Sequence, residues 1–121
     1  MLINFTNHPF DKWTKRQKEA ALDLYEEVKD LPFPEVDPDG DEEYIKQLAD
    51  QYLKCILEFH EPEGNFAVHI QGEFTLVYRM INLLKEYGIK CIASTTRRVV
   101  SENPDGTRTY RFEFVRFREY V

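Results

Sequence analysis

The stretch FAVHIQGEFTLVYRMINLLKEYGIKCIASTTRR, residues 66–98, constrains the fold more than any other part of this chain. Its first five residues are almost wholly apolar, which predicts a strand covered by helices on both faces. A tight turn at Gly72 leads into a predicted helix over about residues 75–87, and Gly88 stands at the C′ position that closes it. A second buried strand is predicted at 89–93. A strand–helix–strand unit of this kind predicts a parallel sheet, and ligands of such sheets bind at the carboxyl ends of the strands.

The N-terminal half predicts two further strands and two further helices. Residues 1–6 (MLINFT) are short, apolar and β-prone. Thr14, with a glutamine three residues later, has the capping-box spacing that starts a helix. A short second strand at 28–31 precedes a proline-rich break, after which Asp41 can cap a helix over about 42–60. The predicted buried face of that helix consists of Ile45, Leu48, Tyr52, Cys55, Ile56 and Phe59.

The C-terminal residues predict a β-hairpin. The turn signal Asn103-Pro104-Asp105-Gly106 separates two β-prone runs, 97–101 and 108–117. Aromatic and charged residues alternate along the second run until the phase slips at Val115, which predicts a β-bulge there. The order of elements therefore predicts a single Rossmann-like domain over residues 1–121. It has three α/β/α layers, with a mostly parallel sheet and a C-terminal antiparallel hairpin.

Composition narrows the compartment and the chemistry. No apolar run approaches the roughly 20 residues of a membrane helix, and the N-terminus lacks a signal-peptide pattern, so we expect a cytoplasmic protein without membrane contact. Cys55 and Cys91 lie inside apolar patterns, which predicts buried free thiols rather than a disulfide in the reducing cytosol. The two cysteines and three scattered histidines have no metal-ligand spacing, so we expect no metal and no other cofactor.

The net charge of −6 conceals an asymmetry between the two halves of the chain. Residues 1–64 carry 7 Lys or Arg against 16 Asp or Glu, whereas residues 65–121 carry 9 against 6. The overall acidity argues against general DNA or RNA binding, which needs a broad basic face. A small anionic ligand needs only a local basic cluster, which the C-terminal half can supply. Alternatively, acidic helices solvate one side of the molecule and strand arginines decorate the other.

Three polar segments follow predicted strands, so we expect them to meet at one edge of the sheet. In Thr6-Asn7-His8-Pro9, Asn7 can donate and accept hydrogen bonds and His8 can transfer a proton, or both residues stabilise a turn. In Gln71-Gly72-Glu73-Phe74-Thr75, the glycine permits close approach of a ligand and the helix N-terminus attracts an anion. The alternative for this segment is a tight turn in which Glu73 favours the helix dipole.

The third segment, Ser94-Thr95-Thr96-Arg97-Arg98, places hydroxyl groups and paired arginines at a strand end, where they can clamp phosphate oxygens. Alternatively, alternate side chains point to opposite faces, so that one arginine at most reaches a given site. His69 lies inside a buried strand, where we expect a core imidazole whose hydrogen bonds are satisfied. Phe74 can stack on a base or pack against protein.

Three signatures stand in order along the chain: NFTNHP, IQGEFTLVYRMINLLKEYGI, and ASTTRR followed by a hairpin ending in FVRFREY. Together they resemble the small stand-alone CRISPR-associated proteins of type III systems, which are related to the CRISPR-associated Rossmann-fold (CARF) sensors and include ring nucleases. The resemblance implies a ligand, cyclic oligoadenylate, which is the second messenger of this antiviral defence. Cyclic tetra-adenylate is the expected form, bound across a homodimer whose two-fold axis matches that of the ring.

The resemblance also implies a possible metal-independent cleavage, in which a ribose 2′-hydroxyl attacks the adjacent phosphorus and leaves a 2′,3′-cyclic phosphate. For that reaction we expect Arg97 or Arg98 to stabilise charge and His8 to transfer a proton. Gln71 or Asn7 would read the adenines. Two alternatives stay open: a non-catalytic sponge or sensor for the same messenger, and an unrelated α/β interaction module.

Overall fold

A computed structural model describes the whole chain, residues 1–121. It contains one five-stranded sheet in the order β2-β1-β3-β4-β5. The strands are β1 (Leu2–Phe5), β2 (Val28–Asp30), β3 (Ala67–Ile70), β4 (Lys90–Glu102) and β5 (Arg108–Glu119). The helical elements are the 3-10 turn η1 (Phe10–Lys12), α1 (Lys15–Tyr25), α2 (Glu42–Leu57) and α3 (Phe74–Glu86). The first four strands are parallel and β5 is antiparallel to β4, which confirms the predicted Rossmann-like α/β class.

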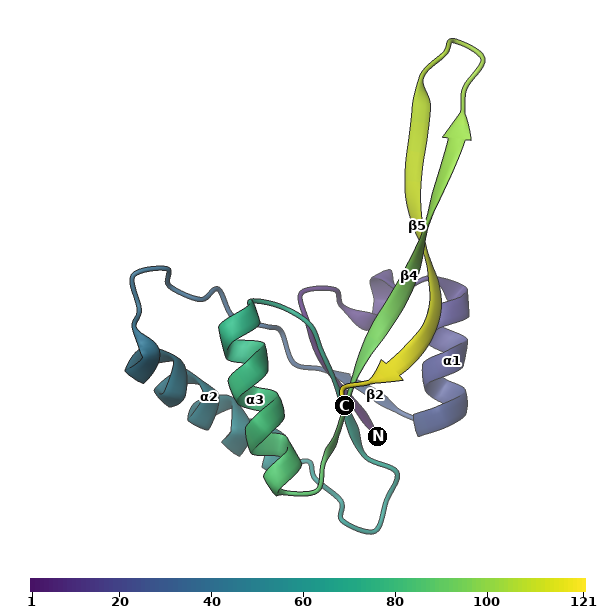
Figure 1. Cartoon of the computed structure of the whole chain (residues 1–121). Helices are drawn as coiled ribbons and strands as arrows, with labels where there is room; N and C mark the ends of the chain where they lie inside the picture. The colour runs from purple at the N-terminus through teal and green to yellow at the C-terminus, as the bar shows by residue number, and fades with distance from the viewer.

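The helices form two layers, one on each face of the sheet (Figure 1). Helix α1 lies against one face, and α2 and α3 lie against the other. The alternation of side chains along β1 explains why both faces need cover, because Leu2 packs on the α1 side while Ile3 and Phe5 pack on the opposite side. None of the three α-helices combines the length and the apolar character that crossing a membrane requires.

Several local predictions are confirmed at residue level. The Thr14 and Asp41 side chains accept hydrogen bonds from backbone N–H groups in the first turns of α1 and α2. Gly88 follows α3 with a φ of 70°, a left-handed conformation that favours glycine. The pairing register of β4 and β5 shifts between Thr95 and Thr96, which leaves Val115 as the extra residue of a bulge.

The predicted end of β4 is wrong. We expected a strand over 89–93 with the polar residues Ser94–Arg98 at its end, but β4 runs without interruption from Lys90 to Glu102. No glycine or proline interrupts residues 89–103, and β5 supplies hydrogen-bond partners along nearly the whole strand. Beyond the bulge the two strands pair only with each other. They form an arm, residues 97–113, that projects away from the helices (Figure 1).

One cysteine prediction is also wrong. Both cysteines are free thiols, and Cys91 is buried as expected, but Cys55 is exposed on α2. The buried residues of α2 are Ala49, Leu53 and Ile56, while Ile45, Leu48 and Tyr52 of the predicted face, and Phe59 just beyond the helix, are half-buried. The buried face of this helix is therefore rotated away from the position that the apolar pattern predicts for Cys55.

Candidate functional site

The carboxyl ends of the parallel strands surround a polar pocket, which we call the strand-end pocket. Its volume is about 390 Å³. It is lined by Thr6, Asn7, His8, Gln17, His69, Gln71, Gly72 and Ser94. The chain leaves β1 toward α1 on one face and leaves β3 toward α3 on the other, so the two loops diverge above neighbouring strands. Ligands of doubly wound sheets bind at such a switch point.

Six of the residues predicted for the site meet in this pocket. They are Thr6, Asn7 and His8 after β1, Gln71 and Gly72 after β3, and Ser94 within β4. Two lining residues, Gln17 of α1 and His69 of β3, were not among the predicted site residues. The lining contains no lysine or arginine, so its hydrogen-bonding groups come from amides, hydroxyls and imidazoles.

A buried asparagine organises the α1 side of the pocket. Asn4 of β1 lies directly opposite His69 of β3 in the parallel register, and it is 1% exposed. Its Nδ2 donates to the His8 carbonyl oxygen at 2.9 Å and to Asp30 Oδ1 at 2.8 Å. Since both partners are acceptors, the amide orientation is fixed, and Oδ1 is the atom that accepts from Thr6 Oγ1 and from the His69 ring.

This network determines the tautomer of His69. Its Nδ1 lies 2.9 Å from Asn4 Oδ1, so we assign the proton to Nδ1. The other ring nitrogen, Nε2, has no hydrogen-bond partner in the protein, although the residue is only 2% exposed. The expectation of a satisfied core imidazole is therefore correct for one nitrogen and wrong for the other.

The surroundings of His69 keep it neutral. Burial is the largest cause and lowers the pKa of His69 to about 4, and the nearby His8 lowers it further, whereas the Gln71 amide opposes the shift. The Gln71 amide contacts Ser94 through its oxygen and one N–H, and no donor lies within hydrogen-bond distance of His69 Nε2. The rings of Trp13 and Phe117 pack edge-on against the imidazole, with centroids 5.3 and 5.5 Å away.

The loop after β1 is held by its backbone. The carbonyl oxygen of His8 accepts from Asn4 Nδ2 and from Trp13 Nε1, and the His8 N–H donates to Thr6 Oγ1. The side chains of Asn7 and His8 are exposed, and no hydrogen bond to the rest of the protein holds either one. A fixed backbone with free side chains leaves these two groups available to a ligand.

The opposite rim joins β3 to β4. Ser94 Oγ donates to Gln71 Oε1 at 2.8 Å, and Gln71 Nε2 lies 3.4 Å from the Ser94 carbonyl oxygen. Gly72 next to it is required by packing, because a Cβ atom there would lie 2.5 Å from the ring of Phe33. Gly72 therefore permits the close approach of a core side chain, Phe33, instead of the predicted close approach of a ligand.

Glu73, Phe74 and Thr75 lie outside the strand-end pocket. The Glu73 carboxylate caps α3 by accepting from the N–H groups of Thr75 and Leu76, at 3.0 and 2.9 Å. Burial opposes the shift, but these bonds and the Thr75 hydroxyl lower the pKa of Glu73. The Glu73 carboxylate thus already occupies the N-terminus of α3, where an anionic ligand was expected. Phe74 is 88% exposed and lines a separate shallow hollow of about 340 Å³.

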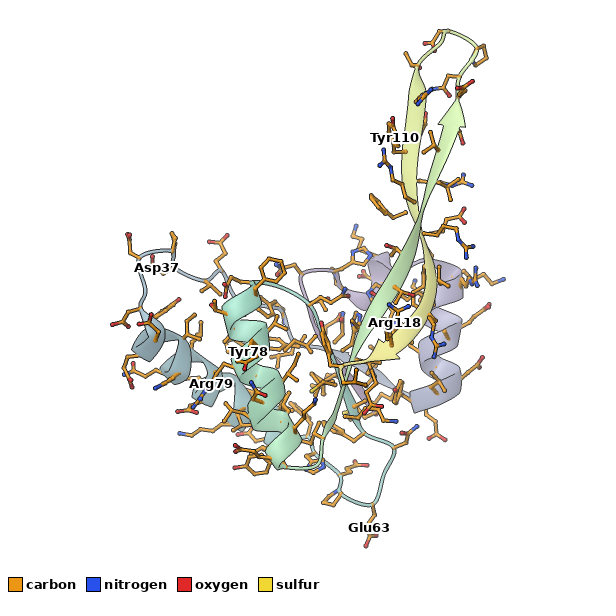
Figure 2. The ribbon with its side chains drawn as sticks, viewed as in Figure 1. Asp37, Glu63, Tyr78, Arg79, Tyr110 and Arg118 are labelled. Atoms are coloured by element: carbon orange, nitrogen blue, oxygen red, sulfur yellow. The ribbon has the colours of Figure 1, made fainter.

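The remaining predicted residues lie along β4 and away from the pocket lining. Thr95 Oγ1 makes two hydrogen bonds at the bulge: it donates to the Arg116 carbonyl oxygen and accepts from the Arg116 N–H. Thr96, Arg97 and Arg98 continue toward the arm and are exposed. The guanidinium of Arg98 stacks over the ring of Tyr110, 4.3 Å from its centroid, and Figure 2 shows Tyr110 on the arm, well clear of the helices.

Other features of the surface are less organised. A hollow of about 620 Å³ beside residues 60–64 is built by a single loop, marked by Glu63 in Figure 2. Another hollow, of about 400 Å³, lies between α2 and α3 near Tyr78 and Arg79. No group of three or more His, Cys, Asp or Glu side chains is arranged to hold a metal ion.

The sheet order and the pocket together define a doubly wound α/β protein with a polar pocket at its switch point. Comparison with known proteins gives the family. The chain belongs to the MJ1673 family, described as "Uncharacterized protein MJ1673 family", whose model matches residues 1–118. The protein MJ1673 of Methanocaldococcus jannaschii is 34% identical over 102 residues, which cover 80% of this chain and 74% of that relative. No solved structure matches this chain.

Proposed function

We propose that this protein binds a cyclic oligoadenylate, with cyclic tetra-adenylate as the first candidate, and acts in type III CRISPR defence in the cytoplasm. The observation that carries the proposal is the strand-end pocket, which no hydrophobic residue lines, at the switch point of the sheet, where doubly wound proteins bind nucleotides. The sequence resemblance to CARF-related proteins supplies the ligand class, and the pocket supplies a place for it.

The size and the lining of the pocket indicate which part of the ring it would take. At about 390 Å³ it stands near the lower end of the roughly 300 to 1,000 Å³ of ligand pockets, so it suits one nucleoside unit rather than a whole ring. Amide and hydroxyl groups from Asn7, Gln71 and Ser94 match the donors and acceptors of adenine and ribose. Because no lysine or arginine lines the pocket, the phosphates would lie at its rim.

A second copy of the chain is the proposed partner, and the arm is the proposed contact. Paired residues on one face of the arm carry exposed apolar side chains: Val100 is 47%, Tyr110 49% and Phe112 67% exposed. A two-stranded ribbon is marginally stable without further contacts, and large exposed aromatic side chains mark interaction surfaces. A symmetric pair of arms would bury these rings and present two pockets to a two-fold symmetric ring.

The proposal includes two modes of action. A ring nuclease would cleave the bound messenger without a metal, whereas a sponge or sensor would only hold it. Arg97 and Arg98 lie outside the pocket, so a single chain would bind the ring without cleaving it. Cleavage would require the arm of the second copy to bring a guanidinium to the phosphates. An α/β interaction module, the third possibility, is favoured by the exposed arm alone.

Thermal unfolding with cyclic tri-, tetra- and hexa-adenylate tests binding, with linear tetra-adenylate as the ligand control. A ring at a hundredfold excess over its Kd would stabilise the protein by roughly 2.7 kcal/mol and raise the Tm measurably. Ser94→Ala removes a lining hydroxyl and would weaken the shift, while Ser101→Ala, an exposed serine on the arm, would leave it unchanged. If no ring raises the Tm of the unaltered protein, the proposed function is wrong.

Incubation of labelled ring with excess protein and EDTA separates the two modes. Loss of the ring and appearance of a 2′,3′-cyclic phosphate would establish a nuclease. A ring that stays intact while it raises the Tm would establish a sponge or sensor.

A further inference from the structure

One group in the strand-end pocket is explained neither by the fold nor by the predicted chemistry: the Nε2 atom of His69. Both polar atoms of the Asn4 amide, the Thr6 hydroxyl and His69 Nδ1 have partners, but Nε2 has none, although the residue is 2% exposed. A buried acceptor without a donor costs roughly 1–3 kcal/mol. His69 lines the pocket, so a ligand seated on its floor can supply the missing donor.

The network also fixes what Nε2 can do. Asn4 Oδ1 holds the proton on Nδ1, and Asp30 and the His8 carbonyl oxygen prevent the Asn4 amide from turning over. The ring cannot rotate freely, because Trp13 and Phe117 pack against its sides. Nε2 is therefore a positioned lone pair, an acceptor that has been fixed before any ligand arrives.

We propose that His69 Nε2 accepts a hydrogen bond from a neutral donor group of the ligand, a hydroxyl or an amino group, on the floor of the strand-end pocket. This inference rests on the proposed function, because an adenylate ring carries both kinds of donor, the ribose 2′-hydroxyl and the adenine amino group. A phosphate oxygen does not fit this position, since its lone pairs would face the lone pair of a neutral imidazole and no lysine or arginine lines the pocket.

The two donors have different consequences. If the adenine amino group occupies the floor, His69 reads the base. If the 2′-hydroxyl occupies it, His69 takes the proton when the 2′-oxygen forms a bond to the adjacent phosphorus. The bond from phosphorus to the 5′-oxygen breaks, and water supplies the proton that the leaving 5′-oxygen needs. His69 is then a catalytic residue, because it touches the reacting atoms.

A cycle of variants and ring analogues tests the proposal. His69→Asn keeps an N–H that can donate to Asn4 Oδ1 and removes the acceptor at Nε2. We expect it to bind cyclic tetra-adenylate about tenfold more weakly than the unaltered protein. His60→Asn, the same substitution at a half-buried histidine outside the pocket, should bind as the unaltered protein does.

The analogues identify the donor. A ring of 2′-deoxyadenylate lacks the hydroxyl, and a ring of inosinate lacks the amino group. We expect one of the two analogues to bind the unaltered protein about tenfold more weakly than the normal ring does. His69→Asn should bind that analogue and the normal ring with equal affinity. Two outcomes would overturn the proposal. In the first, His69→Asn and the unaltered protein bind cyclic tetra-adenylate with equal affinity. In the second, the affinity loss from the substitution and the loss from the analogue are simply additive for both analogues.

A measurement on the unaltered protein separates this inference from the proposed function and does not depend on how the variant folds. Nitrogen-15 NMR of histidine-labelled protein should report an unprotonated Nε2 and a protonated Nδ1 for His69 near neutral pH. A proton on Nε2 would refute the inference whatever the ring does. If no ring binds at all, the proposed function fails, and titration with adenosine then decides the role of His69. A shifted Nε2 resonance supports the inference and an unmoved one refutes it.

Discussion

Asn4 connects more of the candidate site than any other residue. Its single amide joins the loop after β1, the end of β2 through Asp30, and the imidazole of β3. Substitution by alanine would leave His69 Nδ1 without its acceptor inside the protein and would leave the Asp30 carboxylate and the His8 carbonyl oxygen without this donor. We expect Asn4→Ala to lower the free energy of unfolding by about 2–4 kcal/mol, measured by urea denaturation.

The matched control for this prediction is Asn82→Ala. Asn82 is exposed on α3, and alanine is the better helix former, so its stability should stay within about 0.5 kcal/mol of the unaltered protein or rise slightly. Equal effects of the two substitutions would show that the Asn4 network is not a stabilising element.

Protonation of His69 should make the protein sensitive to acid. Its pKa is lowered from 6.5 to about 4 in the folded state, chiefly by burial, so the unfolded chain binds this proton first as the pH falls. Stability is therefore full above about pH 7 and declines between about pH 6.5 and pH 4, by about 3 kcal/mol from this residue. Urea denaturation across this range checks the slope, which should flatten in His69→Asn. An unchanged slope in that variant would mean that other groups cause the acid sensitivity.

At the scale of elements, the start of α3 carries a charged cap. Glu73 accepts two backbone N–H groups of the first turn, so Glu73→Ala should cost about 1 kcal/mol in a thermal or urea melt. Glu86, the last residue of the same helix, is the control, because an acidic side chain at a helix C-terminus opposes the dipole. Glu86→Ala should be neutral or slightly stabilising. A larger loss at Glu86 than at Glu73 would contradict this view of the cap.

The elements that the sequence predicts well are those with local causes. Thr14, Asp41 and Gly88 act within one helical turn, and the bulge at Val115 follows from the phase of neighbouring side chains. The length of β4 was missed because its outer half depends on pairing with β5, and the hydroxyl and arginine residues suggested a strand end. Six pocket residues were predicted because parallel strand order brings their turns together.

His69 was placed correctly in a buried strand, but its chemistry was missed because Asn4 lies 65 positions away in sequence. A usable signal is nevertheless present. Each of two neighbouring buried strands carries one polar residue near its carboxyl end, and alternation puts both on the α1 face. Two polar residues that are buried in register indicate a hydrogen-bonded pair, since buried polar groups are rarely left alone.

At the scale of the whole molecule, the arm should control association. Loss of the apolar rings in a Tyr110→Ser, Phe112→Ser double variant should convert a homodimer into a monomer, as measured by light scattering during size-exclusion chromatography. The control is Tyr78→Ser, which removes an exposed aromatic ring from α3 (Figure 2) and should leave the dimer intact. A monomeric unaltered protein, or a dimer that survives the double substitution, would refute the proposed contact.

The arm has a consequence for how such a protein can diverge. Beyond the bulge its side chains take no part in either hydrophobic core, so insertions, deletions and exchanges there change reach and surface chemistry without disturbing the packing of the sheet. Related chains can therefore acquire new selectivity through this ribbon while the body underneath stays nearly constant. Sequence differences among them should be sought first between residues 97 and 113.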